Sequence, residues 1–566
     1  MKNIIKLSAL AFAAIIMASC NLDYTPSDEL SADVLLKDQE GAAYIVDGCY
    51  AMLKDEVEFI GYASGNTYVR HYYQMQELPA DNMSLAGVTT DDLYQAYAYK
   101  MTDNLKNVGT LWWLAYKVIY MSNTVIETVK EGSSVDADQL LGEAYFLRAL
   151  MHQHMLALFA KPYTVNKAGI GVVIRTSTNT SETKRGTVEE GYNQVVADLQ
   201  KAATLLKENG RGNGGYPCKN SALGLLSRVY LYMGEDDKVI ETVTGMLGGS
   251  DGSDKLESTA TFPTYFANAI NSKETLFCVA HTALETKGQS SIGSMYLNDG
   301  MGWGEIYASQ PLLDLYERYP MDIRYTSFIV PQIFDETKMF VSFADPATPE
   351  PLSAGMAPLI FEVKKAADGV NYEFTEDGKK YTIKSVARTN PQYQNEWEIT
   401  YPQGGKTWPA RVTKQMKNRQ NYFQYYVTKF SYQDGDPMLS SPVMLRWAEV
   451  ILNLAEAYAH KGDNGNAIKY VNVIRNRAGI PAEGMFSTSQ MHGYTNILDV
   501  VMDERRLELA FEGDRRMDVY SNKLNMDRQF PGCHPYTVME YNNDKIQNPI
   551  PQSEYSVSGI EQNPGY

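Results

Sequence analysis

The sequence predicts a mainly α protein, built as a tetratricopeptide-like scaffold of helical pairs with an inserted lobe of loops and a β-hairpin. Three observations support this prediction. One helix–turn–helix pattern occurs twice, several further segments have helical periodicity, and one long stretch changes to Pro, Gly and alternating residues. The composition, 44% hydrophobic and 21% charged, is that of a globular chain with a substantial core.

The clearest helical pair spans residues 448–479. One face of its first helix carries Ile451, Leu454, Ala455 and Tyr458. Gly462 supplies the positive φ that ends such a helix, and a second stripe follows at Ala467, Val471 and Ile474. Residues 221–247 repeat the arrangement around Gly234, and the two copies are similar to the tetratricopeptide pattern. Further helices are expected at residues 112–130, 137–159 and 189–207.

The inserted lobe is expected at about residues 327–428, where Pro, Gly and short alternating runs appear. Residues 371–384 alternate between apolar and polar side chains on both sides of Asp377-Gly378. This pattern is a strong signal for a β-hairpin. Trp397 and Trp408 fall in the same stretch and are candidate surface rings.

Charge and cysteine content exclude some classes of function. The net charge of −17 disfavours nucleic acid as a partner, because a polyanionic surface repels phosphate backbones. Forty tyrosines suit a polar ligand with flat apolar faces, although most are expected to be packing residues. The cysteines are odd in number and lack C-x-x-C spacing, so a zinc knuckle is not indicated. Pairing stays open among Cys49, Cys218, Cys278 and Cys533.

Residues 1–19 have the features of a secretion signal. Lys2 and Lys6 form a basic start, residues 7–17 are apolar, and a run of small residues closes on Cys20. This end resembles the bacterial lipobox, apart from Met17 where Leu is commoner, and implies that Cys20 is lipidated. An ordinary secreted protein with Cys20 as a bystander is the alternative. No other segment reaches the roughly 18 apolar residues of a membrane span, so we expect residues 20–566 to be tethered by lipid.

Several motifs then occur in order along the chain. Residues 442–458 and 471–479 cover most of the helical pair at 448–479. Residues 503–515 read Asp-Glu-Arg-Arg-Leu-Glu-Leu-Ala-Phe-Glu-Gly-Asp-Arg. Glu-Leu-Pro-Ala-Asp stands at 77–81, Asn-Pro-Ile-Pro at 548–551, and Gln-Asn-Pro-Gly-Tyr at 562–566. Together they resemble the SusD/RagB family of surface lipoproteins.

The resemblance implies a helical lipoprotein on the cell surface, anchored in the outer membrane. Such a protein acts as a hinged lid over a SusC-like TonB-dependent transporter. Most members bind an oligosaccharide, and some bind peptides. The acidic residues that follow Cys20 also resemble the export signal of surface lipoproteins in the Bacteroidota.

No catalytic residue, cofactor or metal ligand is expected. Glu504, Glu508 and Glu512 offer the carboxylates that a glycosidase needs, but arginines interleave with them at i+3 and i+4. That spacing is typical of a salt-bridged helix face, and a neighbouring arginine disfavours the raised pKa of a general acid. Residues 248–252 match G-x-S-x-G but follow a helix, so no nucleophile elbow is indicated. The alternatives to glycan binding are peptide binding, a surface hydrolase and a scaffold without a small ligand.

Trp303 is the first candidate for ligand binding. Its loop, residues 298–304, is too polar and Gly-rich to bury a Trp by itself. A similar Gly-Trp loop contributes a sugar-stacking Trp in the starch-binding member of the family. Inward packing that fixes the loop is the alternative. Tyr296, just before the loop, is a second candidate ring.

The remaining ligand candidates lie near the Glu-Leu-Pro motif. Arg70 matches a sugar-contacting arginine of the starch binder, and Asp81 and Asn82 close the motif. The segment that follows carries stacking Trp residues in that relative, whereas here it has Tyr94 and Tyr97. This departure argues against a starch-type ligand. Whether a structural cation is present, or binding needs the transporter, is left open.

Overall fold

The computed structural model describes residues 39–55, 67–85, 87, 91–181, 183–297, 301–343, 358–386, 396–419, 421–530, 534, 536 and 538–566. The expected signal peptide, the lipidation candidate Cys20 and Cys533 lie outside these residues. Among the described helices, none combines the length and the apolar character needed to cross a membrane.

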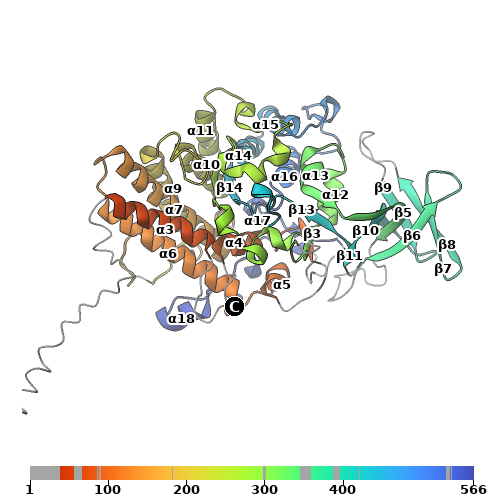
Figure 1. Ribbon diagram of the computed structural model, residues 1–566, viewed down its shortest axis with the longest axis horizontal. Helices are drawn as coiled ribbons and strands as arrows, with labels where there is room; N and C mark the ends of the chain where they lie inside the picture. Colours follow the sequence, from red (N-terminus) through yellow and green to blue (C-terminus); the bar gives the residue numbers. More distant parts are fainter. Residues whose placement is uncertain are drawn as a thin grey trace, which may run out of the picture.

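Long helices packed side by side form the N-terminal part of the molecule (Figure 1). α3 packs on α6, α6 on α7, and α7 on α9. α7 is buried almost all round, which explains why its sequence is apolar on every side. Ser134 caps α7 by accepting a hydrogen bond from the Ala137 N–H at 3.0 Å. The bounds are α3 (Gln39–Lys54), α4 (Tyr68–Glu77), α5 (Asp92–Tyr97), α6 (Lys106–Thr128), α7 (Val135–Phe159), α8 (Tyr163–Asn166) and α9 (Val188–Leu205).

Both predicted helical pairs are confirmed. The first pair is α10 (Lys219–Met233) with α11 (Asp236–Leu247), and the second is α14 (Trp447–His460) with α15 (Asn464–Arg477). Gly234 and Gly462 adopt φ of 73° and 74°, as the turn between two packed helices requires. α11 also packs against α14, so the two pairs are neighbours in space. The helices expected at residues 112–130, 137–159 and 189–207 are α6, α7 and α9.

Short elements complete the helical body. Among the described residues, three two-stranded ladders join distant parts of the chain: β1 (Met83–Leu85) with β3 (Ile306–Ala308), β2 (Thr275–Cys278) with β14 (Val443–Arg446), and β4 (Ile329–Pro331) with β13 (Tyr425–Val427). Two further ladders are local: β11 (Asn418–Arg419) with β12 (Tyr422–Phe423), and β15 (Met526–Asp527) with β16 (Val538–Met539). The other helices are α12 (Gln310–Tyr316), α13 (Ile323–Phe328), α16 (Ile497–Glu508), α17 (Arg515–Ser521) and α18 (Gln552–Ser558).

The inserted lobe is a closed six-stranded barrel at one end of the long axis (Figure 1). The expected hairpin is confirmed, because β7 and β8 pair on either side of Asp377 and Gly378. The sequence did not predict closure, which depends on the pairing of β10 with both β5 and β9. The strands are β5 (Ile333–Phe343), β6 (Leu359–Lys365), β7 (Tyr372–Glu376), β8 (Lys379–Val386), β9 (Glu396–Tyr401) and β10 (Lys406–Met416).

The lobe has a hydrophobic core of its own, separate from the core of the helical body. Trp408 is buried in that cluster and Trp397 packs against it. The expectation that these two are surface rings is therefore wrong. Inward and outward residues alternate along a strand, and closing the barrel turns one complete face into the core.

Candidate functional site

Trp303 lies on an exposed loop between the 3₁₀ turn η6 (Gly293–Met295) and strand β3. Its indole Nε1 donates a hydrogen bond to the Gln289 carbonyl at 3.0 Å, and its backbone N–H donates to the Ser294 carbonyl at 2.6 Å. These bonds hold the ring along one edge, while 55% of the side-chain surface stays exposed. The alternative in which Trp303 packs inward does not hold.

Glycines allow this loop to fold back on itself. A Cβ at Gly302 would lie 2.5 Å from the carbonyl oxygens of both Ser294 and Leu297, closer than side chains approach backbone. Gly304 has a φ of +56°, in the left-handed region that favours glycine. The Gly-Trp-Gly sequence therefore shapes a tight turn that presents the indole to solvent.

Charged and polar groups surround this ring. Glu305 follows it by two residues, and its carboxylate lies 3.8 Å from the guanidinium of Arg419 on β11. Burial raises the pKa of Glu305, Arg419 and Arg70 oppose the rise, and Asp91 adds to it, so these four side chains share one region. Arg70 Nη2 lies 3.5 Å from the Met295 sulfur in the same loop. Arg70 therefore contacts the turn that precedes the Trp303 loop.

Asp81 and Asn82 are placed differently from the prediction. Asp81 is buried and accepts hydrogen bonds from Nε and Nη2 of Arg515 at 2.8 and 2.9 Å. Asn82 is also buried, donating to Glu77 Oε1 at 3.0 Å and accepting from Arg506 Nε at 2.9 Å. Their expected role in contacting ligand is wrong for this conformation. The hydrogen-bonding groups of both side chains bind residues that hold the Glu-Leu-Pro motif in the core.

Three tyrosines proposed as stacking rings are also buried. Tyr296 is only 3% exposed, its ring stacks on Phe430 at 5.6 Å between centroids, and its hydroxyl reaches the Met83 sulfur at 3.5 Å. Tyr94 is buried in the core cluster, as is Tyr97, whose hydroxyl bonds to His534 Nδ1 at 3.0 Å. The prediction fails for these rings because each is covered by segments that are remote in the sequence.

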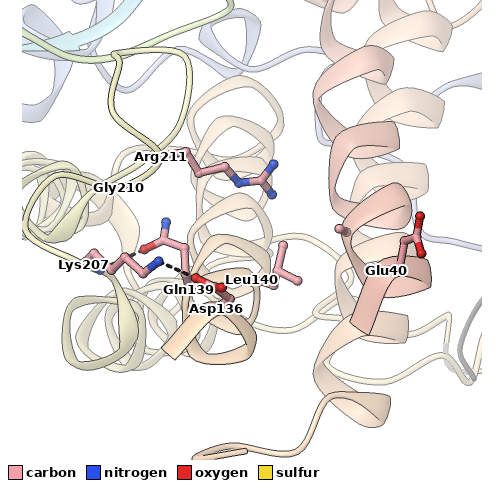
Figure 2. A pocket seen from close by; sticks show the side chains of 8 residues that line it. Glu40, Asp136, Gln139, Leu140, Lys207, Gly210 and Arg211 are labelled. Atoms are coloured by element: carbon pink, nitrogen blue, oxygen red, sulfur yellow. Dashed lines mark hydrogen bonds and ion pairs between the residues drawn. The ribbon is translucent and has the colours of Figure 1, made fainter. Parts of the chain in front are cut away.

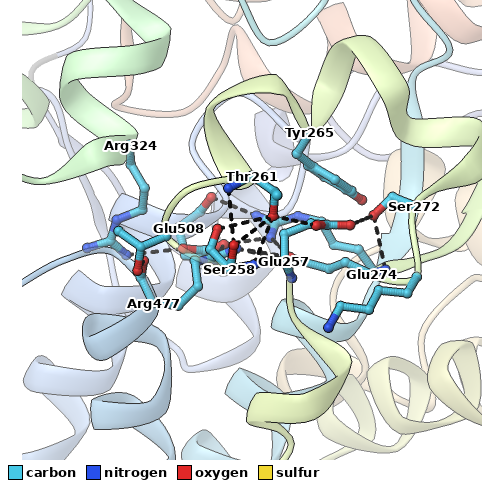
Figure 3. A network of polar contacts seen from close by, with 12 residues as sticks. Glu257, Ser258, Thr261, Tyr265, Ser272, Glu274, Arg324, Arg477 and Glu508 are labelled. Carbon is cyan, nitrogen blue, oxygen red and sulfur yellow. Dashed lines mark hydrogen bonds and ion pairs between the residues drawn. The ribbon is translucent and has the colours of Figure 1, made fainter.

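The glutamates of the C-terminal block lie inside a buried ionic network (Figure 3). Glu508 pairs with Arg324 at 3.2 Å, with Arg446 at 2.6 Å and with Arg477. Burial raises the pKa of Glu508, but the three arginines outweigh it and hold the pKa well below its usual range. The expectation that ion pairs hold these acids is confirmed.

The partners in this network differ from the expected ones. Glu504 pairs with Arg324 and Arg475, and Glu512 with Arg446 and Lys429. The interleaved Arg505 instead binds Asp518 at 2.7 Å. The block is therefore a hub between α13, β14, α15 and α16 rather than a helix face paired within itself.

Two family models match the chain. Residues 273–566 match the model described as the SusD family. Residues 22–231 match a model described as starch-binding and associating with the outer membrane. The first match covers more than half of the chain. The chain belongs to the SusD family.

Relatives of this SusD-family chain agree with that assignment. Two SusD-like proteins of Formosa agariphila, P2 and P38, are 24% and 22% identical over 83% and 90% of this chain and 82% and 89% of their own. A SusD superfamily structure from Bacteroides thetaiotaomicron has a TM-score of 0.69 and 24% identity, covering 94% of this chain and all of its own. The surface glycan-binding protein A of Bacteroides fluxus has a TM-score of 0.59 and 20% identity, covering 94% and 100%. These structures share the fold.

Two open pockets in the described part of the SusD-family chain have linings that do not include Trp303 or its loop. One, of about 530 Å³, lies where the first turns of α3 and α7 meet Lys207 and Arg211 (Figure 2). Most of its charges are in ion pairs, since Lys207 bonds to Asp136 and Arg211 to Asp47 and Glu143, while Glu40 accepts a hydrogen bond from Tyr44. The other, of about 660 Å³, lies over α9, α10 and α11. Among the residues with described positions, no group of three acidic, His or Cys side chains is arranged for a metal ion.

Glu305 and Arg419 are the site residues that sequence reasoning missed. Glu305 had a local signal, because it stands directly after the Gly-Trp-Gly turn. Arg419 had no local signal, because it reaches the Trp303 loop from a hairpin more than a hundred residues further along the chain.

The cysteine pairing that the sequence left open is resolved for three residues: Cys49, Cys218 and Cys278 are free thiols.

Proposed function

We propose that this SusD-family chain is a non-enzymatic lipoprotein of the cell surface that captures an oligosaccharide and delivers it to a SusC-like TonB-dependent transporter of the outer membrane. The observation that carries the proposal is Trp303, an exposed indole held in place by a shaped loop and flanked by Glu305, Arg419 and Arg70. A sugar has apolar C–H faces that stack on such a ring and hydroxyls that bond to the polar side chains around it.

The lack of catalysis is part of the proposal. A glycosidase needs one carboxyl group with a raised pKa and a second carboxylate opposite it. Glu504, Glu508 and Glu512 are buried among arginines that hold them in salt bridges, so they have no access to a substrate. Glu305 has a raised pKa and Asp91 adds to that rise, but the salt-bridge partner of Glu305 is Arg419, whose charge opposes the protonated form that a general acid needs.

The proposed anchor is Cys20, which the resemblance to a lipobox places at the mature N-terminus. Eighteen residues separate it from Gln39, where α3 begins. Radiolabelled palmitate incorporation into the full chain and into Cys20→Ala tests this step. Label in the wild type alone is the expected result, and label in both would contradict it.

A glycan and peptide array on the chain from residue 21 onward tests the binding function. We expect one related set of glycans to bind, Trp303→Ala to lose it, and Trp303→Phe to keep part of it. Tyr120→Ala is the matched control, because Tyr120 is 41% exposed on α6. Binding of peptides alone, or cleavage of any bound glycan, would contradict the proposal.

A further inference from the structure

The loop that carries Trp303 lies against a second loop. Each of the two loops has one buried aromatic ring and one solvent-exposed aromatic ring. The first loop, of which residues 293–297 and 301–304 are described, buries Tyr296 and exposes Trp303. The second, residues 430–436, buries Phe430 and exposes Tyr432, whose side chain is 43% exposed. The two inner rings stack on each other with their planes 22° apart. Since the inner rings face each other, the loops lie side by side.

Backbone contacts confirm that the loops adjoin. Gly293 packs so closely on the Phe430 carbonyl that a Cβ there would collide with it. The next residue, Ser294, donates its hydroxyl to the Gln289 carbonyl at 2.7 Å, the same oxygen that holds the indole of Trp303. Only Ser431 separates Phe430 from Tyr432. A short path of packed groups therefore joins the loop that carries Trp303 to the loop that carries Tyr432.

The loop that carries Tyr432 is held in a strained form. Tyr432 and Asp434 have φ of 69° and 52°, unusual for residues other than glycine. Gln433 between them is buried, and its side chain donates to the His281 carbonyl at 2.6 Å and accepts from Ser441 at 2.8 Å. The buried amide forces the neighbouring ring outward. Strained residues kept in place by their surroundings concentrate at ligand-contacting sites.

We propose that Tyr432 is a second stacking ring of the site, so that the ligand is an oligosaccharide whose successive sugar units contact Trp303 and Tyr432. This inference rests on the proposed glycan-binding function. Exposed Asp434 beside one ring and half-buried Glu305 beside the other supply acceptors for sugar hydroxyls. A single sugar covers one ring only, whereas a chain gains from both.

The test compares short and long ligands by isothermal titration calorimetry on the chain from residue 21 onward. The probes are the disaccharide and the hexasaccharide of three neutral series: α-glucan, β-glucan and β-mannan. For the series that binds, Tyr432→Ala should lower the affinity for the hexasaccharide about five- to tenfold and leave the affinity for the disaccharide unchanged. Trp303→Ala should weaken both. Tyr432→Phe keeps the ring and should bind like the wild type.

Two controls separate the ring from the fold. Tyr432→Gly removes the ring and relieves the positive φ, so it should stay folded and lose the same affinity as Tyr432→Ala. Tyr120→Ala should bind like the wild type. Unchanged hexasaccharide affinity in Tyr432→Ala and Tyr432→Gly would overturn the second ring and leave the Trp303 site standing. Equal loss for both ligand lengths would overturn the two-unit assignment. Absence of binding to every probe by the wild type would count against both proposals.

Discussion

The carboxylate of Asp81 and the guanidinium of Arg515 form a two-pronged ion pair, with N–O distances of 2.8 and 2.9 Å, across 434 positions of the chain. Asp81 closes the Glu-Leu-Pro-Ala-Asp motif, and Arg515 closes the Arg-rich C-terminal block. Glu77 of the same motif accepts the backbone N–H groups of Phe511 and Gly513 at 2.8 and 3.0 Å. The two family motifs therefore bind each other through one set of contacts, called the clamp below: Asp81 with Arg515, and Glu77 with the backbone of Phe511 and Gly513.

Asp81→Ala should destabilise the protein by about 3–5 kcal/mol, because it removes a buried carboxylate and leaves Arg506 and Arg515, both partly buried, without their counter-charge. Urea unfolding followed by circular dichroism measures the loss. Asp136→Ala, which removes an exposed partner of Lys207, is the control and should be close to neutral. A loss for Asp81→Ala no larger than for this control would show that the clamp is unimportant for stability.

His460 links α14 to the start of α11 and predicts a pH dependence. Burial lowers its pKa, but its hydrogen bond to Asp236 at 2.9 Å, with the charge of Glu456, raises the pKa to about 9. Because the folded-state pKa lies above the unfolded value of about 6.5, protonated His460 stabilises the fold fully below about pH 6.5. This stabilisation is lost as the pH rises through about 9. His460→Gln should therefore cost on the order of 2 kcal/mol at pH 6 and little at pH 10. A pH-independent difference between variant and wild type would contradict this.

Gly302→Ala should disable the Trp303 loop without unfolding the core. Its Cβ would collide with two carbonyl oxygens, so the loop must open and the indole must move. We expect glycan binding to fall at least as far as in Trp303→Ala, with an unchanged thermal midpoint for the helical body. Gly245→Ala on α11 meets no atom within 4 Å and serves as the matched glycine control. Full binding by Gly302→Ala would show that the loop shape is not needed.

Glu508→Gln tests the buried ionic hub. The substitution keeps the shape of the side chain but removes the charge that Arg324, Arg446 and Arg477 share. Loss of one member of a buried ion pair typically costs about 3–5 kcal/mol, and three arginines here depend on one carboxylate. Chemical denaturation should show at least this loss. Stability equal to the wild type would mean that the remaining acids satisfy all three arginines.

The barrel lobe should be removable. Lys417 N–H donates to the Gln332 carbonyl at 2.9 Å, so the two ends of segment 333–416 are adjacent and a short Gly-Ser turn can join them. The lobe has its own core and contacts α12 mainly through Arg411 with Asp314 and Glu317. The shortened chain should keep a cooperative thermal transition and full ligand binding. A broad transition would show that the body needs the lobe.

Local sequence was sufficient for the secondary structure. Apolar periodicity with a glycine at each turn predicted both helical pairs, and alternation around Asp377-Gly378 predicted the β7–β8 hairpin, because these patterns act between residues close along the chain. The polar, Gly-rich composition around Trp303 indicated an exposed indole as one possibility, but the sequence left inward packing open as the alternative. The order of motifs along the chain was enough to identify the family.

Only the tertiary structure decided which rings and charges face solvent. Tyr296 and Tyr432 are both tyrosines in polar loops, yet Phe430 covers the first while buried Gln433 turns the second outward. Glu508 binds arginines of three other elements rather than those beside it in the sequence. Burial and ion pairing depend on partners that lie on other elements, remote in the sequence, and the periodicity of a single segment carries no information about them.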